Sequence, residues 1–111
     1  MRGVRRMAMD IQMMRLEDTE RISVIGEVDV SNASELRDEL DIQLASTPCA
    51  IEVDLAQVPY IDSTGIGVLV AFAHKAFEAG IAFHVTNPQR NVARVFTLLD
   101  VADKLGVRES D

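Results

Sequence analysis

The residues of this chain that are best suited to chemistry lie in one short stretch, Tyr60 to Val68. Ser63 stands between a strand-like segment, Ile51–Leu55, and a strongly apolar helical pattern. It is therefore expected at a helix N-terminus, where a hydroxyl can cap free backbone N–H groups. Gly65 and Gly67 each cost roughly 0.5–1 kcal/mol relative to alanine inside a helix, which indicates a surface that is approached closely. A phosphate on Ser63 would be stabilised because helix N-termini attract anions.

A serine nucleophile is the main catalytic alternative for Ser63, and it needs a base within hydrogen-bond reach. His74 lies 11 residues further along the same expected helix, or about 16 Å away at the standard rise. His84 is expected on the polar face of a strand, away from the helix layer. Ile61 stands where the nucleophile elbow G-x-S-x-G needs its first glycine. We therefore expect no catalytic residues, and we interpret both histidines as surface residues.

Signatures of cofactor and metal binding are also missing. Gly65 and Gly67 would need a third glycine at Val70 to complete the dinucleotide fingerprint, and no Walker lysine follows. Cys49 is the only cysteine, and the usual Cys/His spacings of metal sites are absent. We expect Cys49, beside Pro48 and before a strand, to be a packed small hydrophobic residue. No cofactor and no metal are predicted.

Turn and cap signals divide the chain into the elements that must position Ser63. Glu17–Glu20 is a polar connection of hairpin length. Asn32 with Glu35 forms a capping-box pattern, and Gly80 is a helix stop signal. Asn87-Pro88 has the cap-then-proline order that is typical of a helix start. The expected strands are 11–16, 21–28, 51–55 and 81–86, and the expected helices run from Asn32 to near Pro48, from Ser63 to Ala79, and from Asn87 to about Leu99.

The strand patterns predict how the layers are arranged. Ile51, Val53 and Leu55 alternate with acidic residues, which indicates that one sheet face is buried and the other is open or thinly covered. A hairpin followed by right-handed strand–helix–strand crossovers predicts an α/β fold. We expect a small mixed β-sheet of four to five strands with helices packed mainly on one face. The carboxyl ends of the strands would then form one rim, a common place for binding sites, and this rim comprises 26–32, 56–65 and 86–89.

The helix that starts at Ser63 is apolar nearly all the way round its first half, so its pattern alone does not orient it. We expect its core face to be formed by Ile66, Leu69, Val70, Ala73 and Phe77. Val68, Ala71 and Phe72 would then be left partly exposed. Two interpretations remain for them: a transient protein interface beside Ser63, or packing under a neighbouring helix.

Three segments resemble one known family. Ile61 to Gly67 is similar to the signature loop of the STAS domain family, and more narrowly to that of the bacterial anti-sigma factor antagonists. Val24 to Val30 is similar to the family's strand ending in Gly-(Glu/Asp)-(Leu/Ile/Val)-Asp, and Asn87-Pro88-Gln89 followed by a helix agrees as well. The resemblance extends from about Ile11 to about Val107. Many members have serine where this chain has Thr64.

The resemblance implies a partner-switching role. The unphosphorylated protein would bind an anti-sigma factor with serine kinase activity and thereby release a sigma factor. Phosphorylation of Ser63 by that partner would end the binding, and a protein serine phosphatase would restore it. Asp62 is interpreted either as a helix cap or as a group that orients the Ser63 hydroxyl for the kinase. The expected partner-binding residues are Asp29, Ser31, Asn32, Asp62, Ser63, Thr64, Gly65 and Gly67.

Two alternatives to this role stay open at this point. One is a STAS subunit of a larger assembly, such as a stressosome-like scaffold or a transport complex. The other is a small nucleotide-binding or hydrolytic protein, for which turnover by the purified chain would be the evidence.

Length and composition limit which classes of protein and partner remain possible. The 111 residues suit a single domain, and we expect a flexible N-terminal extension over residues 1–10 followed by one STAS domain over 11–111. A net charge of −7 and a pI near 4.7 argue against nucleic acid as a partner. The longest apolar run is too short to cross a bilayer, and the N-terminus lacks the apolar core of a signal peptide. We expect no membrane insertion and a cytoplasmic location.

Overall fold

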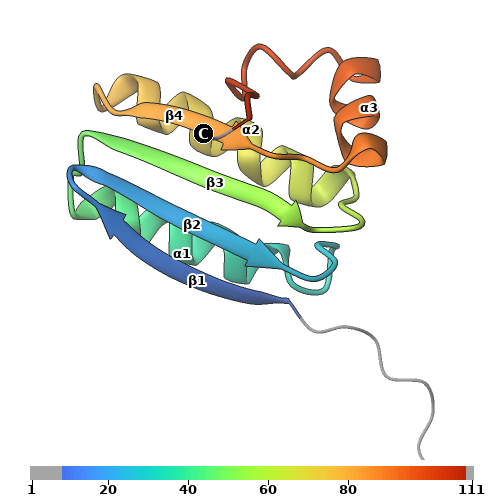
Figure 1. Cartoon of the computed structure of the whole chain (residues 1–111), viewed down its shortest axis with the longest axis horizontal. Coiled ribbons are helices and arrows are strands. Elements are labelled where there is room, and N and C mark those ends of the chain that lie inside the picture. Colours follow the sequence, from blue (N-terminus) through green and yellow to red (C-terminus); the bar gives the residue numbers. More distant parts are fainter. Residues whose placement is uncertain (1–8, 110–111) are drawn as a thin grey trace, which may run out of the picture.

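Four strands form one sheet in the order β1–β2–β3–β4 (Figure 1). The structure is a computed structural model that describes residues 9–109, so part of the expected N-terminal extension lies outside the described residues. A two-residue connection joins β1 to the antiparallel β2, and β3 and β4 follow as parallel neighbours. The strands are β1 (Asp10–Leu16), β2 (Thr19–Ile25), β3 (Ala50–Gln57) and β4 (Ala82–Thr86), and the helices are α1 (Ala33–Ala45), α2 (Ser63–Glu78) and α3 (Arg90–Leu98).

Two helices, α1 and α2, cover one face of this sheet (Figure 1). The side chains of Ile51, Val53 and Leu55 point into that layer and are fully buried, because apolar residues alternate with acidic ones along β3. Ile22 and Val24 on β2 are buried on the same face. The predicted mixed sheet with helices mainly on one face is therefore confirmed.

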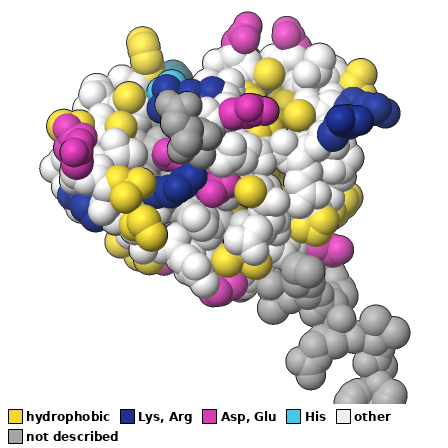
Figure 2. All heavy atoms as spheres, in the orientation of Figure 1, with side chains coloured by type: hydrophobic (Ala, Val, Ile, Leu, Met, Phe, Trp, Pro, Cys, Tyr) yellow, Lys and Arg dark blue, Asp and Glu magenta, His cyan; other side chains and the backbone are white. Residues whose placement is uncertain are grey.

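The opposite face of the sheet carries a polar cluster. The Arg21 guanidinium lies 3.1 Å from Glu52 Oε2 and 3.4 Å from Asp54 Oδ2. The Thr86 hydroxyl donates to Glu52 Oε2 at 2.9 Å, and Asn87 Nδ2 donates to Asp54 Oδ1 at 3.3 Å. Basic side chains lie beside acidic ones on this face in Figure 2. Since paired charges can be partly buried at low cost, no helix layer is needed there.

The free edge of β4 is covered by the end of the chain. Val85 N–H donates to the Leu105 carbonyl, and Arg108 N–H donates to the Val85 carbonyl. Thr86 and Arg108 form an isolated parallel bridge, while the side chain of Leu105 is fully buried. The segment 105–108 thus pairs with the edge of β4 although it is too short to count as a fifth strand.

Several predicted element boundaries differ from the structure: β2 already begins at Thr19, so the predicted connection 17–20 is only two residues long, and β3 continues to Gln57. Two other boundaries are wrong by three residues. Strand β2 ends at Ile25, three residues before the predicted end, because Gly26 adopts a positive φ of 105° and turns the chain. Helix α3 begins at Arg90 with Gln89 as its N-cap, later than the predicted start. Asn87 instead takes a left-handed conformation with φ 56° while its side chain binds Asp54.

The predicted orientation of α2 is wrong for its two phenylalanines. Phe72 is buried and packs edge-to-face on Phe83 of β4, with ring centroids 5.3 Å apart. Phe77, which we expected in the core, is 81% exposed. The buried face of α2 consists of Gly65, Ile66, Leu69, Phe72 and Ala76.

The expectation for Cys49 was also wrong, since Cys49 is exposed while the neighbouring Pro48 is buried. Its backbone N–H still pairs with the Asp18 carbonyl. The start of β3 is therefore anchored through the main chain.

Candidate functional site

Ser63 is the first residue of α2 and its side chain is exposed. The cap is Asp62, which confirms one of the two interpretations of that residue: its Oδ1 accepts a hydrogen bond from Gly65 N–H at 3.0 Å. The Ser63 hydroxyl does not act as the cap. Within residues 9–109 the Ser63 hydroxyl has no hydrogen-bond partner, and Thr64 beside it is exposed too. The helix start therefore presents an unengaged hydroxyl beside a fixed carboxylate.

Asp62 also holds the neighbouring loop. Its second oxygen, Oδ2, accepts a hydrogen bond from Val30 N–H at 3.1 Å. Below this contact the Asp62 N–H donates to the Val28 carbonyl, and Val28 N–H donates to the Tyr60 carbonyl. The three bonds fasten residues 28–30 against the start of α2, so two segments that are distant in sequence form one surface.

The loop that precedes α1 is ordered by its own side chains. Asp29 Oδ1 accepts from the backbone N–H of Ser31 at 2.9 Å and from its hydroxyl at 2.5 Å. Asn32 Oδ1 accepts from Asp29 N–H, and Asn32 Nδ2 donates to the Glu27 carbonyl, both at 2.9 Å. Asn32 is the N-cap of α1 but its side chain makes no capping bond. The predicted capping box is therefore wrong, because the Asn32 side chain stabilises the loop instead.

The two glycines of α2 have different surroundings. A Cβ on Gly65 would lie 2.7 Å from Val28 Cγ1 and 2.8 Å from Ile61 Cγ1, which is closer than packed carbon atoms come. Gly65 is buried, whereas Gly67 is exposed and a Cβ on it would meet no atom within 4 Å. Gly65 thus lets the loop and helix pack together, while only Gly67 leaves room for an incoming molecule.

Sequence reasoning missed two exposed apolar side chains around Ser63. Val30 is 74% exposed even though its backbone is held by Asp62, and Tyr60, three residues before Ser63, is about half exposed. The available signal was an apolar residue between Asp29 and Ser31, in an otherwise polar turn. A groove of about 250 Å³ between α1 and α2 continues this surface, lined by residues that include Thr64, Gly67 and Val68.

The structure separates both histidines from Ser63. His74 lies on the exposed outer side of α2, where its Nε2 is 3.3 Å from Glu78 Oε2. His84 contacts the Gly106 carbonyl through Nδ1 at 3.2 Å. Among residues 9–109 no group of three or more histidine, cysteine or acidic side chains is arranged to hold a metal ion. Nor does any helix in that part of the chain have the length and apolar character to cross a membrane.

The mixed four-stranded sheet with helices on one face is a fold that solved proteins share. The STAS domain model matches residues 11–110. The chain belongs to the STAS domain family.

Individual members and structures of known role are also similar to this chain. The chain is 27% identical to the anti-sigma-B factor antagonist of Bacillus subtilis over 101 residues, covering 91% of this chain and 92% of that one. An anti-sigma factor antagonist from Mycobacterium paratuberculosis superposes with a TM-score of 0.85 at 20% identity, covering 93% and 87% of the two chains. The Bacillus cell fate determinant SpoIIAA, solved in its phosphorylated form, gives a TM-score of 0.72 at 16% identity over 94% and 92%. The proteins to which this chain is similar thus include antagonists of anti-sigma factors.

Proposed function

We propose that this protein is an anti-sigma factor antagonist that works by partner switching. In the unphosphorylated form it binds an anti-sigma factor with serine kinase activity, in the cytoplasm. The partner then transfers a phosphoryl group from ATP to Ser63, and binding is lost until a protein serine phosphatase removes the phosphate. The chain itself contributes no catalytic group to this cycle.

The observation that carries the proposal is the combination of Ser63 and Asp62 at the start of α2. An exposed hydroxyl that has no hydrogen-bond partner among residues 9–109 is accessible to a kinase. The Asp62 carboxylate beside it is fixed by Gly65 N–H and Val30 N–H, so its charge stays in place whatever happens to Ser63. The names of the relatives agree with this role.

The physics favours a change of surface rather than a change of fold. A phosphate adds about −1.5 to −2 charge, which a helix N-terminus tolerates. On an interface, however, it lies beside the negative Asp62 and adds bulk to the contact surface. Like-charge contacts at an interface cost several kcal/mol, and a loss of about 3 kcal/mol corresponds to roughly 150-fold in affinity. That is enough to exchange one partner for another.

The test is incubation of the purified chain with the candidate anti-sigma kinase and ATP, followed by intact-mass and fragment mass spectrometry. We expect one phosphate, on Ser63, and none on the Ser63→Ala variant. Phosphate on Thr64 or Ser31 alone would overturn the assignment of the acceptor. ATP turnover by the chain without any kinase would instead favour the enzymatic alternative.

A further inference from the structure

The outer side of α2, opposite its buried face, carries a stripe of five residues. Ser63, Gly67, Val70, His74 and Phe77 follow each other at alternating steps of four and three residues, so they share one face of the helix. All are exposed except Val70, which is half-buried. The stripe begins at the proposed phosphoacceptor and ends, about 21 Å further on, at the 81%-exposed ring of Phe77.

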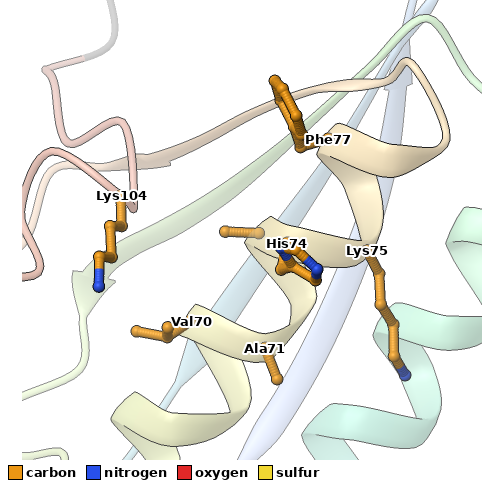
Figure 3. Close-up of a pocket in the computed structure, with 7 residues that line it drawn as sticks. Val70, Ala71, His74, Lys75, Phe77 and Lys104 are labelled. Carbon is orange, nitrogen blue, oxygen red and sulfur yellow. The ribbon is translucent and has the colours of Figure 1, made fainter.

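A groove runs beside this stripe. It has a volume of about 710 Å³ and is bordered by α2 and by Lys104 from the C-terminal segment. Figure 3 shows Val70, His74 and Phe77 on successive turns of α2, with Lys104 on one side and Lys75 directed toward α1 on the other. Apolar side chains dominate its lining, which is formed by Val70, Ala71, Ala73, His74, Lys75, Phe77 and Lys104.

The charge of this groove differs from that of the whole chain. The protein has 18 acidic and 11 basic residues, yet two lysines and a histidine line the groove without any carboxylate. Lys75 contacts Asp41 of α1 at 3.1 Å and His74 contacts Glu78, but all four side chains are well exposed, and such pairs are weak. Lys104 forms no ion pair with any described residue. The groove is therefore suited to an acidic occupant.

We propose that α2 docks an amphipathic helix of the anti-sigma partner along this outer stripe. Apolar side chains of that helix contact Val70 and Phe77, its carboxylates lie toward Lys75 and Lys104, and Gly67 allows its backbone to come close. Helices bind grooves in this way through apolar residues spaced three and four apart. This inference rests on the proposed function and adds the chemistry of the bound segment.

The position of Ser63 at one end of the stripe gives the switch a physical basis. A patch of about 800 Å² per partner is the usual size of a stable interface, and it spans the distance from Ser63 to Phe77. A phosphate at Ser63 then lies at the end of a contact with an acidic helix, and it repels that helix as well as Asp62.

Titration of single variants against the anti-sigma kinase tests the docking surface. Phe77→Ala should weaken binding by about 30-fold, as expected for an aromatic anchor. Lys104→Glu should also weaken binding, and this loss should become larger as the salt concentration is lowered. Leu98→Ala, at a position 76% exposed on α3, and Arg94→Glu, the same charge change on α3, are the matched controls and should bind like the wild type. Circular dichroism checks that every variant is folded.

Equal affinity of the wild type, Phe77→Ala and Lys104→Glu would overturn the docking surface while leaving the proposed function intact. Failure of the wild type to bind the kinase or to receive phosphate from it would overturn the proposed function, and this inference with it.

Photocrosslinking identifies the occupant. With p-benzoylphenylalanine in place of Phe77, the crosslinked peptide should come from an acidic helical segment of the kinase. Crosslinks confined to a second copy of this chain, or to a basic segment of the kinase, would contradict the proposal.

Discussion

Asp62 and Val30, 32 positions apart in sequence, are joined by a hydrogen bond of 3.1 Å from the Val30 N–H to Oδ2 of Asp62. The other oxygen of the same carboxylate caps α2 through Gly65 N–H. One side chain thus fixes both the helix that carries Ser63 and the loop that presents an exposed valine. Its two roles can be separated by mutation.

Replacing Asp62 tests this double role. Asp62→Ala removes the cap and the loop contact, and we expect the free energy of unfolding to fall by about 1–2 kcal/mol. Asp62→Asn keeps an acceptor for one of the two N–H groups and should lose less. Urea unfolding gives the stabilities, and amide hydrogen exchange at Val30 reports the loop. If Val30 exchanges equally slowly in Asp62→Ala, the contact does not hold the loop.

The glycines of α2 should respond in opposite directions to the same substitution. Gly65→Ala forces a Cβ against Val28 and Ile61, and we expect a destabilisation of about 1–3 kcal/mol. Gly67→Ala fills empty space on an exposed helix turn and should stabilise by about 0.5–1 kcal/mol. Thermal or urea unfolding decides, and a change of the same sign in both variants would contradict the packing described above.

A bulky residue at position 67 should act on binding rather than on folding. Gly67→Leu adds a side chain where only a partner can meet it, so we expect a normal unfolding midpoint and a weakened complex with the anti-sigma kinase. Calorimetric titration measures the complex. Unchanged affinity per folded molecule, or a collapsed midpoint, would show that the space around Gly67 does not serve the partner.

Ser63→Ala and Ser63→Asp should both remain folded, because position 63 is an exposed helix start. The alanine variant should bind the partner and resist phosphorylation. The aspartate variant should bind more weakly because it places a second carboxylate beside Asp62, although one carboxylate carries less charge than a phosphate. Titration of both variants separates the mechanisms. Equal binding by the two, together with release of the phosphorylated protein through unfolding of the helix start, would rule out the repulsion described here.

The polar cluster on the open sheet face gives a prediction about stability. Arg21 lies between the partly buried carboxylates of Glu52 and Asp54. Arg21→Met would leave two negative charges close together without their cation, and we expect a loss of about 2–4 kcal/mol in unfolding free energy. Arg37→Met is a suitable control, since the Arg37–Asp38 pair is exposed. A loss below about 0.5 kcal/mol at position 21 would show that solvent screens the cluster.

Much of the fold follows from local sequence. The alternation of Ile51, Val53 and Leu55 with acidic residues leaves only one way to bury β3. Gly80, with φ 75°, ends α2 where its sequence signal indicates. Signals of this kind depend only on residues a few positions apart. For that reason the sheet and the extent of α2 could be predicted.

The wrong predictions concern features that are determined by contacts between residues far apart in the sequence. Phe72 and Phe77 cannot be told apart by periodicity in a helix that is apolar on nearly every side, and only contact with Phe83 selects Phe72. Asn32 and Asn87 both have side chains able to cap a helix. In the structure these side chains instead form hydrogen bonds with Glu27, Asp29 and Asp54. Ser63 does lie at the start of α2, on the expected rim, but the exposed Val30 was missed because its position depends on Asp62.

The contrast between Gly65 and Gly67 also bears on how related antagonists in one cell could avoid each other's kinases. A change at Gly65 damages the fold, so that position offers no means of telling partners apart. Gly67, His74 and Phe77 on the outer side of α2 are exposed, so they can be exchanged at little cost in stability. Discrimination between partners needs residues that oppose the wrong one as well as residues that favour the right one. A duplicated copy of this chain could therefore acquire a separate partner through a few substitutions on one helix face, with Ser63, the proposed phosphoacceptor, left in place.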